Sequence, residues 1–175
     1  MQVVILCGGL GTRLRSETEF KPKPLVRIGN RPILWHIMRI YSAYGFYRFH
    51  LCAGYKGDLI KDYFRNYRQE EHDIEIDLAN GGVSLLDHSE EVLPWNVRIQ
   101  DTGEDMLAGS RIQRAMKYVS GDEFLATYGD GVVEVNMKAL IESHRKSVKL
   151  ATITAVRPLS TFGELGIEGD TATAF

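Results

Sequence analysis

The sequence lacks the features of a membrane protein or a nucleic-acid-binding protein. No apolar run approaches the roughly 18 residues that a membrane-spanning helix requires. The 21 basic and 23 acidic residues nearly cancel to a net charge of −2, so the whole chain has no attraction for nucleic acid or a membrane surface. The short apolar run at the start ends at glycines without a basic segment before it, which argues against a signal peptide. Any phosphate binding must therefore come from a few local residues.

Cysteine is scarce as well. The two thiols, Cys7 and Cys52, lie in apolar runs, and no metal-ligand spacing connects them. We predict free, buried thiols and a cytoplasmic location, because disulfides form mainly in oxidising compartments. The five histidines also include no pair with the spacing of metal ligands.

What the chain does contain is an alternation of strand and helix patterns. Its 175 residues, 44% of them hydrophobic, are enough for one domain over residues 1–175 with its own core. Apolar or alternating runs predict strands at residues 3–7, 48–53, 74–78, 97–100, 124–127 and 150–156. Helical spacing predicts helices from Pro32 to Gly45 and at residues 55–67, 107–119 and 135–147. This order predicts a three-layer α/β fold, with a mostly parallel, Rossmann-like sheet covered by helices on both faces.

Three stretches depart from that alternation. Residues 10–30 contain glycines and prolines without a helical period and are predicted to form a long loop, which in a compact domain is usually functional. Residues 83–92 are predicted to be an extended excursion. Residues 171–175 alternate polar and apolar side chains like a strand that stops without a turn or cap. We therefore expect the chain to be a fragment, truncated at its C-terminus.

A glycine-rich segment directly follows the first predicted strand. Gly8, Gly9 and Gly11 are followed by Thr12 and Arg13. Ligands of open α/β sheets bind at the carboxyl ends of strands, where glycines let backbone N–H groups approach phosphate oxygens and arginine adds a planar charged fork. The spacing matches neither the dinucleotide fingerprint nor a Walker A loop. The pattern favours a loop that binds a nucleoside triphosphate, and the alternative is a tight turn without a ligand.

A basic segment, Lys21-Pro22-Lys23-Pro24, follows about ten residues later along the predicted loop. Its prolines fix φ and predict a stiff, extended segment. A lysine on such a segment has few positions to search, which suits a charge aimed at one phosphate. The alternative is a solvated basic loop.

Two further candidates lie later in the chain. Asp130, between Gly129 and Gly131, follows the strand predicted at 124–127 and can reach a metal in the same crevice. Mg²⁺ prefers one or two carboxylates together with phosphate oxygens and water, but Asp-Gly is also a common turn pair. Arg111 lies near the start of a predicted helix, where a solvated arginine is the alternative to a ligand contact.

Together these segments resemble the nucleotide-sugar pyrophosphorylases. The family pattern Gly-Gly-x-Gly-Thr-Arg-Leu, a spacer and Lys-Pro-Lys-Pro-Leu-Val stands at residues 8–14 and 21–26. Further segments resemble the branch that acts on CTP and glucose-1-phosphate, namely residues 33–38, 54–57, 94–97, 101–103 and 127–131. The resemblance covers essentially the whole chain. It implies a GT-A-like nucleotidyltransferase fold and a cytoplasmic, homo-oligomeric enzyme of polysaccharide or O-antigen biosynthesis.

The resemblance also implies a role for each matching residue. The base and ribose of CTP would be bound by Leu6, Cys7, Gly8, Gly9, Leu10 and Gly11. Thr12 and Arg13 would hold the β- and γ-phosphates, Lys23 would stabilise the α-phosphoryl transition state, and Asp130 would bind Mg²⁺. Arg13 and Lys23 are thus the catalytic candidates, and Arg111 and Gly129 count as substrate contacts. Where the family has Thr-Gly-Gly before its arginine, this chain has Ala108-Gly109-Ser110, which removes one hydroxyl contact.

Several alternatives remain open on these patterns. The first motif is shared with enzymes that transfer uridylyl or thymidylyl groups. A non-catalytic nucleotide-binding fragment or subunit, or an α/β domain without a nucleotide site, would also fit parts of the pattern. Family chains continue with a sugar-phosphate lysine and a second metal-binding aspartate, which have no place in this sequence. Residues 83–95 are the predicted contact region of a homo-oligomer.

Overall fold

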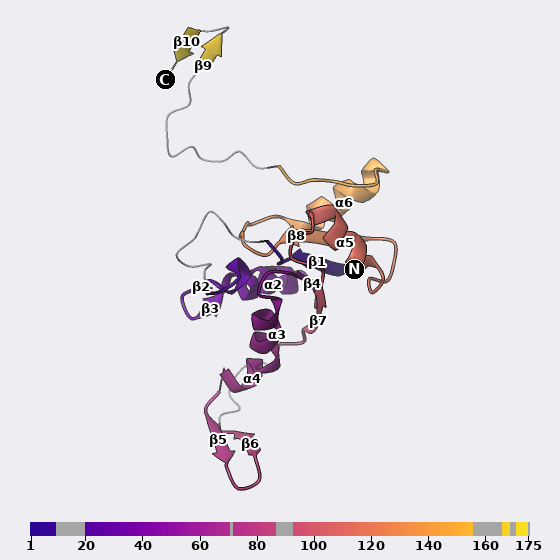
Figure 1. Cartoon of the computed structure of the whole chain (residues 1–175). Helices are drawn as coiled ribbons and strands as arrows, with labels where there is room; N and C mark the ends of the chain where they lie inside the picture. The colour runs from indigo at the N-terminus through magenta and orange to yellow at the C-terminus, as the bar shows by residue number, and fades with distance from the viewer. Residues whose placement is uncertain (10–19, 71, 87–92, 156–165, 169–170, 175) are drawn as a thin grey trace. The chain divides into compact units, whose positions relative to one another are not determined.

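The computed structural model describes residues 1–9, 20–70, 72–86, 93–155, 166–168 and 171–174 (Figure 1). The chain divides into two compact units, residues 1–134 and 135–175. The first unit contains the predicted glycine loop, Lys23, Arg111 and Asp130, so all of the predicted site residues belong to unit 1.

Unit 1 is built on a parallel sheet of four strands in the order β7-β4-β1-β8. These strands are β1 (Gln2–Leu6), β4 (Arg48–Ala53), β7 (Asn96–Asp101) and β8 (Phe124–Tyr128). β1 pairs with β4 on one side and β8 on the other, so Ile5 lies beside both Leu51 and Thr127. The predicted parallel sheet is confirmed, and so are its four predicted strands.

The helices of unit 1 lie on both faces of this sheet. They are α2 (Ile33–Ala43), α3 (Gly57–Arg65), the short α4 (Tyr67–Glu70) and α5 (Ala108–Met116). The β1-α2-β4 and β4-α3-β7 connections step across the sheet in one direction, whereas β7-α5-β8 steps back. Right-handed connections therefore place α2 and α3 on one face and α5 on the other, as Figure 1 shows. This is the predicted three-layer arrangement.

The core follows from the apolar pattern of these elements. In β1, Val3, Val4 and Ile5 are fully buried, because both of its faces are covered. In α2, Leu34, Ile37, Met38 and Tyr41 form the buried stripe expected from helical spacing. The helix ends as predicted, since Gly45 follows it in the left-handed region with φ of 85°.

The single helix predicted at residues 55–67 is wrong in detail. Lys56 adopts a left-handed conformation with φ of 50° before α3, and Asn66 separates α3 from α4. The carbonyl of Asn66 accepts bonds from Gln69 and Glu70, which starts the second helix. Asparagine competes poorly as a helix-interior residue and favours caps, so the periodicity of the aromatic residues concealed a break.

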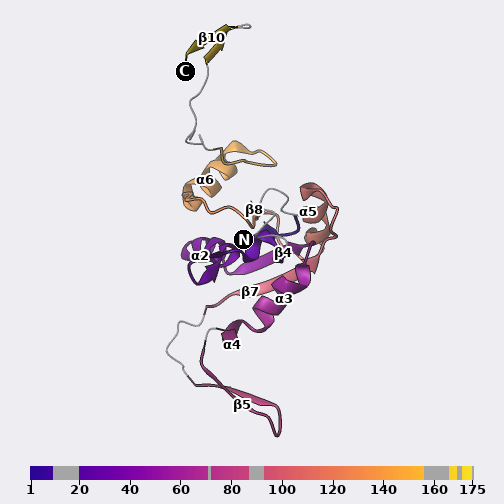
Figure 2. The same cartoon turned by 60° about the vertical axis from the view of Figure 1, so that its left-hand side comes forward.

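The loop predicted for residues 10–30 is also more ordered than expected in its described part. A short 3-10 turn, η1 (Lys23–Leu25), precedes a small antiparallel pair, β2 (Arg27–Ile28) with β3 (Arg31–Pro32). Farther along, β5 (Ile74–Asp77) and β6 (Gly82–Leu85) form a hairpin that projects from the sheet (Figure 2). The strand predicted at 74–78 is thus confirmed, and residues 87–92 of the predicted excursion lie outside the described residues.

Unit 2 contains α6 (Met137–Ser147), whose N-cap Asn136 accepts a hydrogen bond from the Ala139 N–H at 3.1 Å. It also contains the antiparallel pair β9 (Gly166–Glu168) and β10 (Thr171–Ala174). The strand predicted at 150–156 is wrong over residues 150–155, where Leu150 and Ile153 are exposed and no neighbouring strand pairs with them. A sequence with strand propensity forms a strand only where a neighbouring strand or a packed surface is available. Among the described residues, no helix is long and apolar enough to cross a membrane.

Candidate functional site

A cavity of about 560 Å³ lies where β1 and β8 end, beside the start of α5. Parallel pairing aligns the carboxyl ends of β1, β4 and β8 at one edge of the sheet, which is the usual ligand position in open α/β folds. The residues that line the cavity are Leu6, Cys7, Gly8, Gly9, Lys23, Pro24, Glu104, Asp105, Met106, Leu107, Ala108, Arg111, Tyr128 and Asp130.

Backbone hydrogen bonds continue past the strand ends and fix the first residues of the loops. The Cys7 N–H donates to the Cys52 carbonyl at 3.0 Å, and the Gly129 N–H donates to the Leu6 carbonyl at 2.9 Å. On the far side of β4, the Thr102 N–H donates to the Ala53 carbonyl at 2.8 Å. The cavity floor is therefore part of the sheet rather than a free loop.

The Lys-Pro-Lys-Pro segment reaches the cavity through a close contact with the end of β8. A Cβ on Gly129 would lie 3.1 Å from Pro24 Cγ and 2.9 Å from Cys7 Sγ, so glycine allows Pro24 to pack there. Pro22 is extended, as predicted, but Lys23–Leu25 forms a 3-10 turn instead of an extended segment. A proline φ near −65° fits both conformations, and the Leu25 N–H closes the turn on the Pro22 carbonyl at 2.8 Å.

This packing brings Lys23 and Asp130 together across 107 residues of sequence. Lys23 Nζ lies 3.3 Å from Asp130 Oδ2, and their side chains are 21% and 40% exposed. An ion pair this exposed contributes little to stability, about 0–1 kcal/mol. Both charges therefore remain accessible to a ligand at the mouth of the cavity.

Arg111 from α5 closes the opposite wall and is 4% exposed. The alternative of a solvated arginine on a helix face is therefore wrong. Its guanidinium donates to atoms at or just after the ends of three strands, β1, β4 and β7. The acceptors are the carbonyls of Gly8 (2.9 Å), Ala53 (3.3 Å), Gly103 (2.6 Å), Glu104 (2.8 Å) and Met106 (2.9 Å) and the Thr102 hydroxyl (2.9 Å).

The two cysteines are free and buried, as predicted. Burial raises the pKa of Cys7 far above its usual value, and Cys52 and Asp130 add to the shift. Burial likewise raises the pKa of Cys52 to about 11. Neither thiol is a nucleophile near neutral pH, because the thiolate is the reactive form.

The structure brings together the predicted residues that it describes. Those that line the cavity are Leu6, Cys7, Gly8, Gly9, Lys23, Arg111 and Asp130, and Gly129 lies directly before Asp130. Leu10, Gly11, Thr12 and Arg13 lie outside the described residues. Sequence reasoning missed the wall formed by residues 104–108, although the Asp101-Thr102-Gly103 segment at the end of β7 points to it.

Asp130 is a suitable ligand for a divalent cation that is held mainly by phosphate. Among the described residues there is no cluster of three or more side chains of the usual metal-ligating types. The Asp130 carboxylate fits Mg²⁺, which takes one or two carboxylates together with phosphate oxygens and water. The donor set does not fit a metal enclosed by protein ligands alone.

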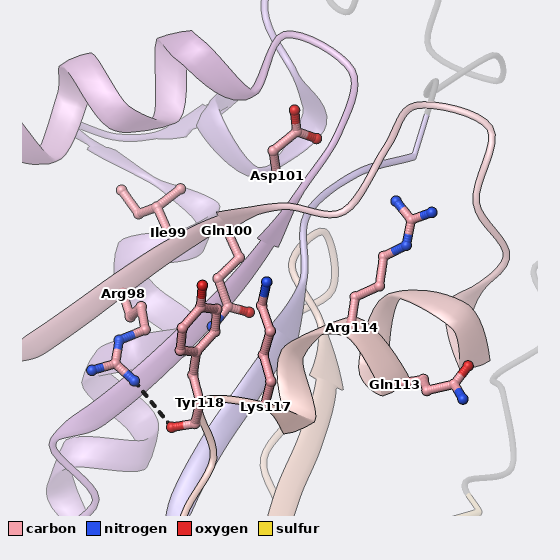
Figure 3. Close-up of a pocket in the computed structure, with 8 residues that line it drawn as sticks. All are labelled: Arg98, Ile99, Gln100, Asp101, Gln113, Arg114, Lys117 and Tyr118. Carbon is pink, nitrogen blue, oxygen red and sulfur yellow. Dashed lines mark hydrogen bonds between the residues drawn. The ribbon is translucent and has the colours of Figure 1, made fainter.

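A second cavity, of about 720 Å³, lies between β7 and the end of α5 (Figure 3). Arg98 and Lys117 flank the ring of Tyr118, at 5.2 and 4.7 Å from its centre. Cations in the last turn of a helix oppose the partial negative charge of its C-terminus, and Arg114 donates to the Thr102 carbonyl at 3.1 Å. None of the predicted site residues lines this cavity, and its basic residues make the ring and helix-end contacts just described.

The chain was compared with protein families, with curated proteins and with solved structures. The model of the family described as nucleotidyl transferase matches residues 2–174. A glucose-1-phosphate cytidylyltransferase of Salmonella typhi is 47% identical over the whole chain, which spans 68% of that relative's length. A probable glucose-1-phosphate cytidylyltransferase of Bacillus subtilis is 42% identical with the same coverage. The crystal structure of HddC from Yersinia pseudotuberculosis complexed with GMP-PN has a TM-score of 0.59 and 30% identity, covering 82% of this chain and 53% of HddC.

Proposed function

The chain belongs to the nucleotidyl transferase family, and from this premise we propose that it transfers a cytidylyl group from CTP to glucose-1-phosphate, giving CDP-glucose and pyrophosphate. The supporting observation is the meeting of Lys23 and Asp130, 3.3 Å apart, in the cavity that the glycine loop enters. The names of the two relatives at 47% and 42% identity support CTP and glucose-1-phosphate as substrates. The 175 residues would form one nucleotidyltransferase domain, or the nucleotide-binding part of one.

The reaction needs little covalent chemistry from the protein. A phosphate oxygen of glucose-1-phosphate attacks the α-phosphorus of CTP, and the bond to pyrophosphate breaks. The nucleophile is already an anion, so the protein has to bring two anions together and offset the charge that develops. Lys23 supplies that charge at the α-phosphoryl group, and Arg13 with Thr12 holds the β- and γ-phosphates.

The remaining predicted residues would hold the nucleoside and the metal. Residues 6–11 would surround the base and ribose, where the glycines leave room for the ligand to approach the backbone, and Gly129 would be a further substrate contact. Asp130 would bind Mg²⁺, which supplies charge neutralisation between phosphate groups when it is present. The ion pair between Asp130 and Lys23 would open when Lys23 contacts the α-phosphate of CTP and Asp130 binds the metal.

We also propose that the protein works in the cytoplasm as a homo-oligomer. The hairpin supports this assembly, because Ile74, Ile76, Val83 and Leu85 share one face through the register Ile74↔Leu85 and Ile76↔Val83. Ile76 is 51% exposed and Val83 is 45% exposed. A two-stranded hairpin is at best marginally stable alone in water. A second copy of the chain would cover this apolar face, next to the predicted contact region 83–95.

The test is pyrophosphate release from a panel of triphosphates. The protein is incubated with Mg²⁺, glucose-1-phosphate and CTP, UTP, dTTP or GTP, each with and without the sugar phosphate. We expect release that needs glucose-1-phosphate and is fastest with CTP. Faster release with UTP or dTTP would contradict the choice of base. Binding of CTP by calorimetry without turnover would support the non-catalytic alternative instead.

A further inference from the structure

The guanidinium of Arg111 has no donor left for a ligand. Arginine carries five N–H groups, and the three nitrogens of Arg111 donate to six oxygen atoms of the protein at 2.6–3.3 Å. Five of these acceptors are backbone carbonyls. They lie at the last residue of β4 and in the segments that follow β1 and β7, so one side chain connects three strand ends.

Two glycines leave the space that this guanidinium occupies. A Cβ on Gly8 would lie 1.9 Å from Arg111 Nη1 and 2.4 Å from Cζ, and no backbone atom is among its nearest neighbours. A Cβ on Gly54 would lie 2.5 Å from the same Nη1, but also 2.7 Å from the Gly103 carbonyl and 2.9 Å from the Gly8 carbonyl. Among the described residues, no atom lies within 4 Å of such a Cβ on Gly9, the next residue of the loop.

We propose that Arg111 is a positioning residue for the nucleotide site, which holds the glycine loop in place through the Gly8 carbonyl, and that Gly8 is glycine because of Arg111. The two adjacent glycines of the loop then have different roles. Gly8 faces the guanidinium, whereas Gly9 borders the cavity and remains open to a ligand.

This role makes a prediction that a direct contact with CTP does not. If Arg111 acted only on the nucleotide, changes at Gly8 and Arg111 would lower the stability of the ligand-free protein independently. In the proposed arrangement the two changes are coupled, because the three atoms nearest to a Cβ on Gly8 all belong to Arg111. Residues in direct contact show such non-additivity, whereas separate residues do not.

The first measurement is the melting temperature of the intact protein without nucleotide. We expect Gly8→Ala to lower it by roughly 5 °C or more, because an atom at 1.9 Å forces Arg111 out of its place. Gly9→Ala should leave it within about 1 °C of the wild type, since nothing lies near its Cβ. Gly109→Ala on α5, also without neighbours, controls for the effect of adding a methyl group elsewhere.

The second measurement is the melting temperature of Gly8→Ala combined with Arg111→Lys. A lysine ends in a slender ammonium, so Gly8→Ala should now cost less than half of its original drop in melting temperature. Gly54→Ala should not be relieved, because two backbone carbonyls also block its Cβ. Equal drops for Gly8→Ala in both backgrounds would overturn the proposal. If Arg111→Lys does not fold, Arg111→Met provides the background, and the contrast between Gly8→Ala and Gly9→Ala still decides the steric part.

The functional readout rests on the proposed CTP reaction. Arg111→Lys should raise the KM for CTP about tenfold or more while kcat changes less, because Lys23 and Asp130 are held by the separate contact of Pro24 with Gly129. A loss of kcat alone, with KM unchanged, would contradict a positioning role. If the wild type binds no CTP, the proposed function fails, but the coupling of Gly8 and Arg111 in the ligand-free protein is still measured.

Discussion

The edge of the sheet at the cavity and the β5–β6 hairpin belong to the same unit but differ in how their backbone is held. At the cavity, carbonyls of residues 8, 53, 103, 104 and 106 all accept bonds from one buried arginine. Among the described residues, the hairpin is held by its own register and by bonds within its turn, such as the one that Asp77 accepts from the Ala79 N–H at 2.8 Å. Its side chains in β5 are all exposed.

The two regions therefore differ in whether unit 1 itself supplies the contacts that cover and hold them. The described part of the cavity is held by contacts within unit 1, namely the bonds of Arg111 and the Lys23–Asp130 ion pair. The hairpin is amphipathic, with Glu75 opposite Ser84 on its polar face, yet its apolar face has no cover among the described residues of unit 1. An uncovered apolar surface of this kind marks an interaction site.

The largest expected effect is at the cavity. Lys23→Ala should lower kcat by about 10²–10³, because removing one group that stabilises charge in the transition state typically costs this much. The assay is pyrophosphate release with CTP and glucose-1-phosphate. Lys61→Ala is the matched control, since Lys61 is exposed and lies on α3, where it pairs with Asp58 at 3.0 Å. Near-normal turnover of Lys23→Ala would remove the catalytic assignment.

The next-largest effect is expected from a substitution in the apolar face of the β5–β6 hairpin. Ile76→Asp places a charge in the apolar face, and burying an unpaired charge costs at least about 2 kcal/mol, or about 30-fold in association. Sedimentation over a range of concentrations should show the variant dissociating where the wild type does not. Glu75→Gln, on the polar face, should leave the assembly unchanged. A wild type that sediments as a monomer at all concentrations would refute the proposed contact.

A smaller effect concerns pH and the sheet itself. His50 is buried, its Nε2 donates to Gln2 Oε1 at 2.5 Å, and its Nδ1 accepts from Gln100 at 3.3 Å. Burial, and then the charge of Arg98, lower the pKa of His50. The unfolded chain therefore binds the proton first, and stability should fall as the pH drops below about 6.5.

Chemical denaturation between pH 7.5 and 5.5 measures that slope. His50→Gln should flatten it, because glutamine does not titrate in this range. A wild-type stability that rises as the pH drops from 7.5 to 5.5 would contradict the lowered pKa of His50.

The smallest effect is an expected absence of reaction. Both thiols are buried with raised pKa values, so the native protein should not react with a thiol reagent at pH 8 within the mixing time. After unfolding in guanidinium the same reagent should report both cysteines. Rapid labelling of the native protein would show that the cavity floor opens more readily than its hydrogen bonds suggest.

The sequence predicted the sheet, α2, α5 and the position of Asp130 in the same crevice as the glycine loop. These depend on apolar runs and on the rule that parallel strands align their ends. It did not predict that Arg111 is buried, because an arginine near the start of a helix has the same local pattern whether it faces solvent or three strand ends. The sequence also failed to predict the break at Asn66, and it wrongly predicted a strand over residues 150–155. The reason is related, because local periodicity does not show whether a segment has a neighbour to pack against or pair with.

The bond between Arg111 and the Gly8 carbonyl joins residues 103 positions apart, and this separation has a consequence for how the protein is made. During synthesis the glycine loop leaves the ribosome long before the arginine that fixes it, and non-local contacts of this kind form late. The nucleotide site is therefore among the last parts of unit 1 to mature. A nascent chain should become able to retain CTP only after α5 has emerged and packed against β1.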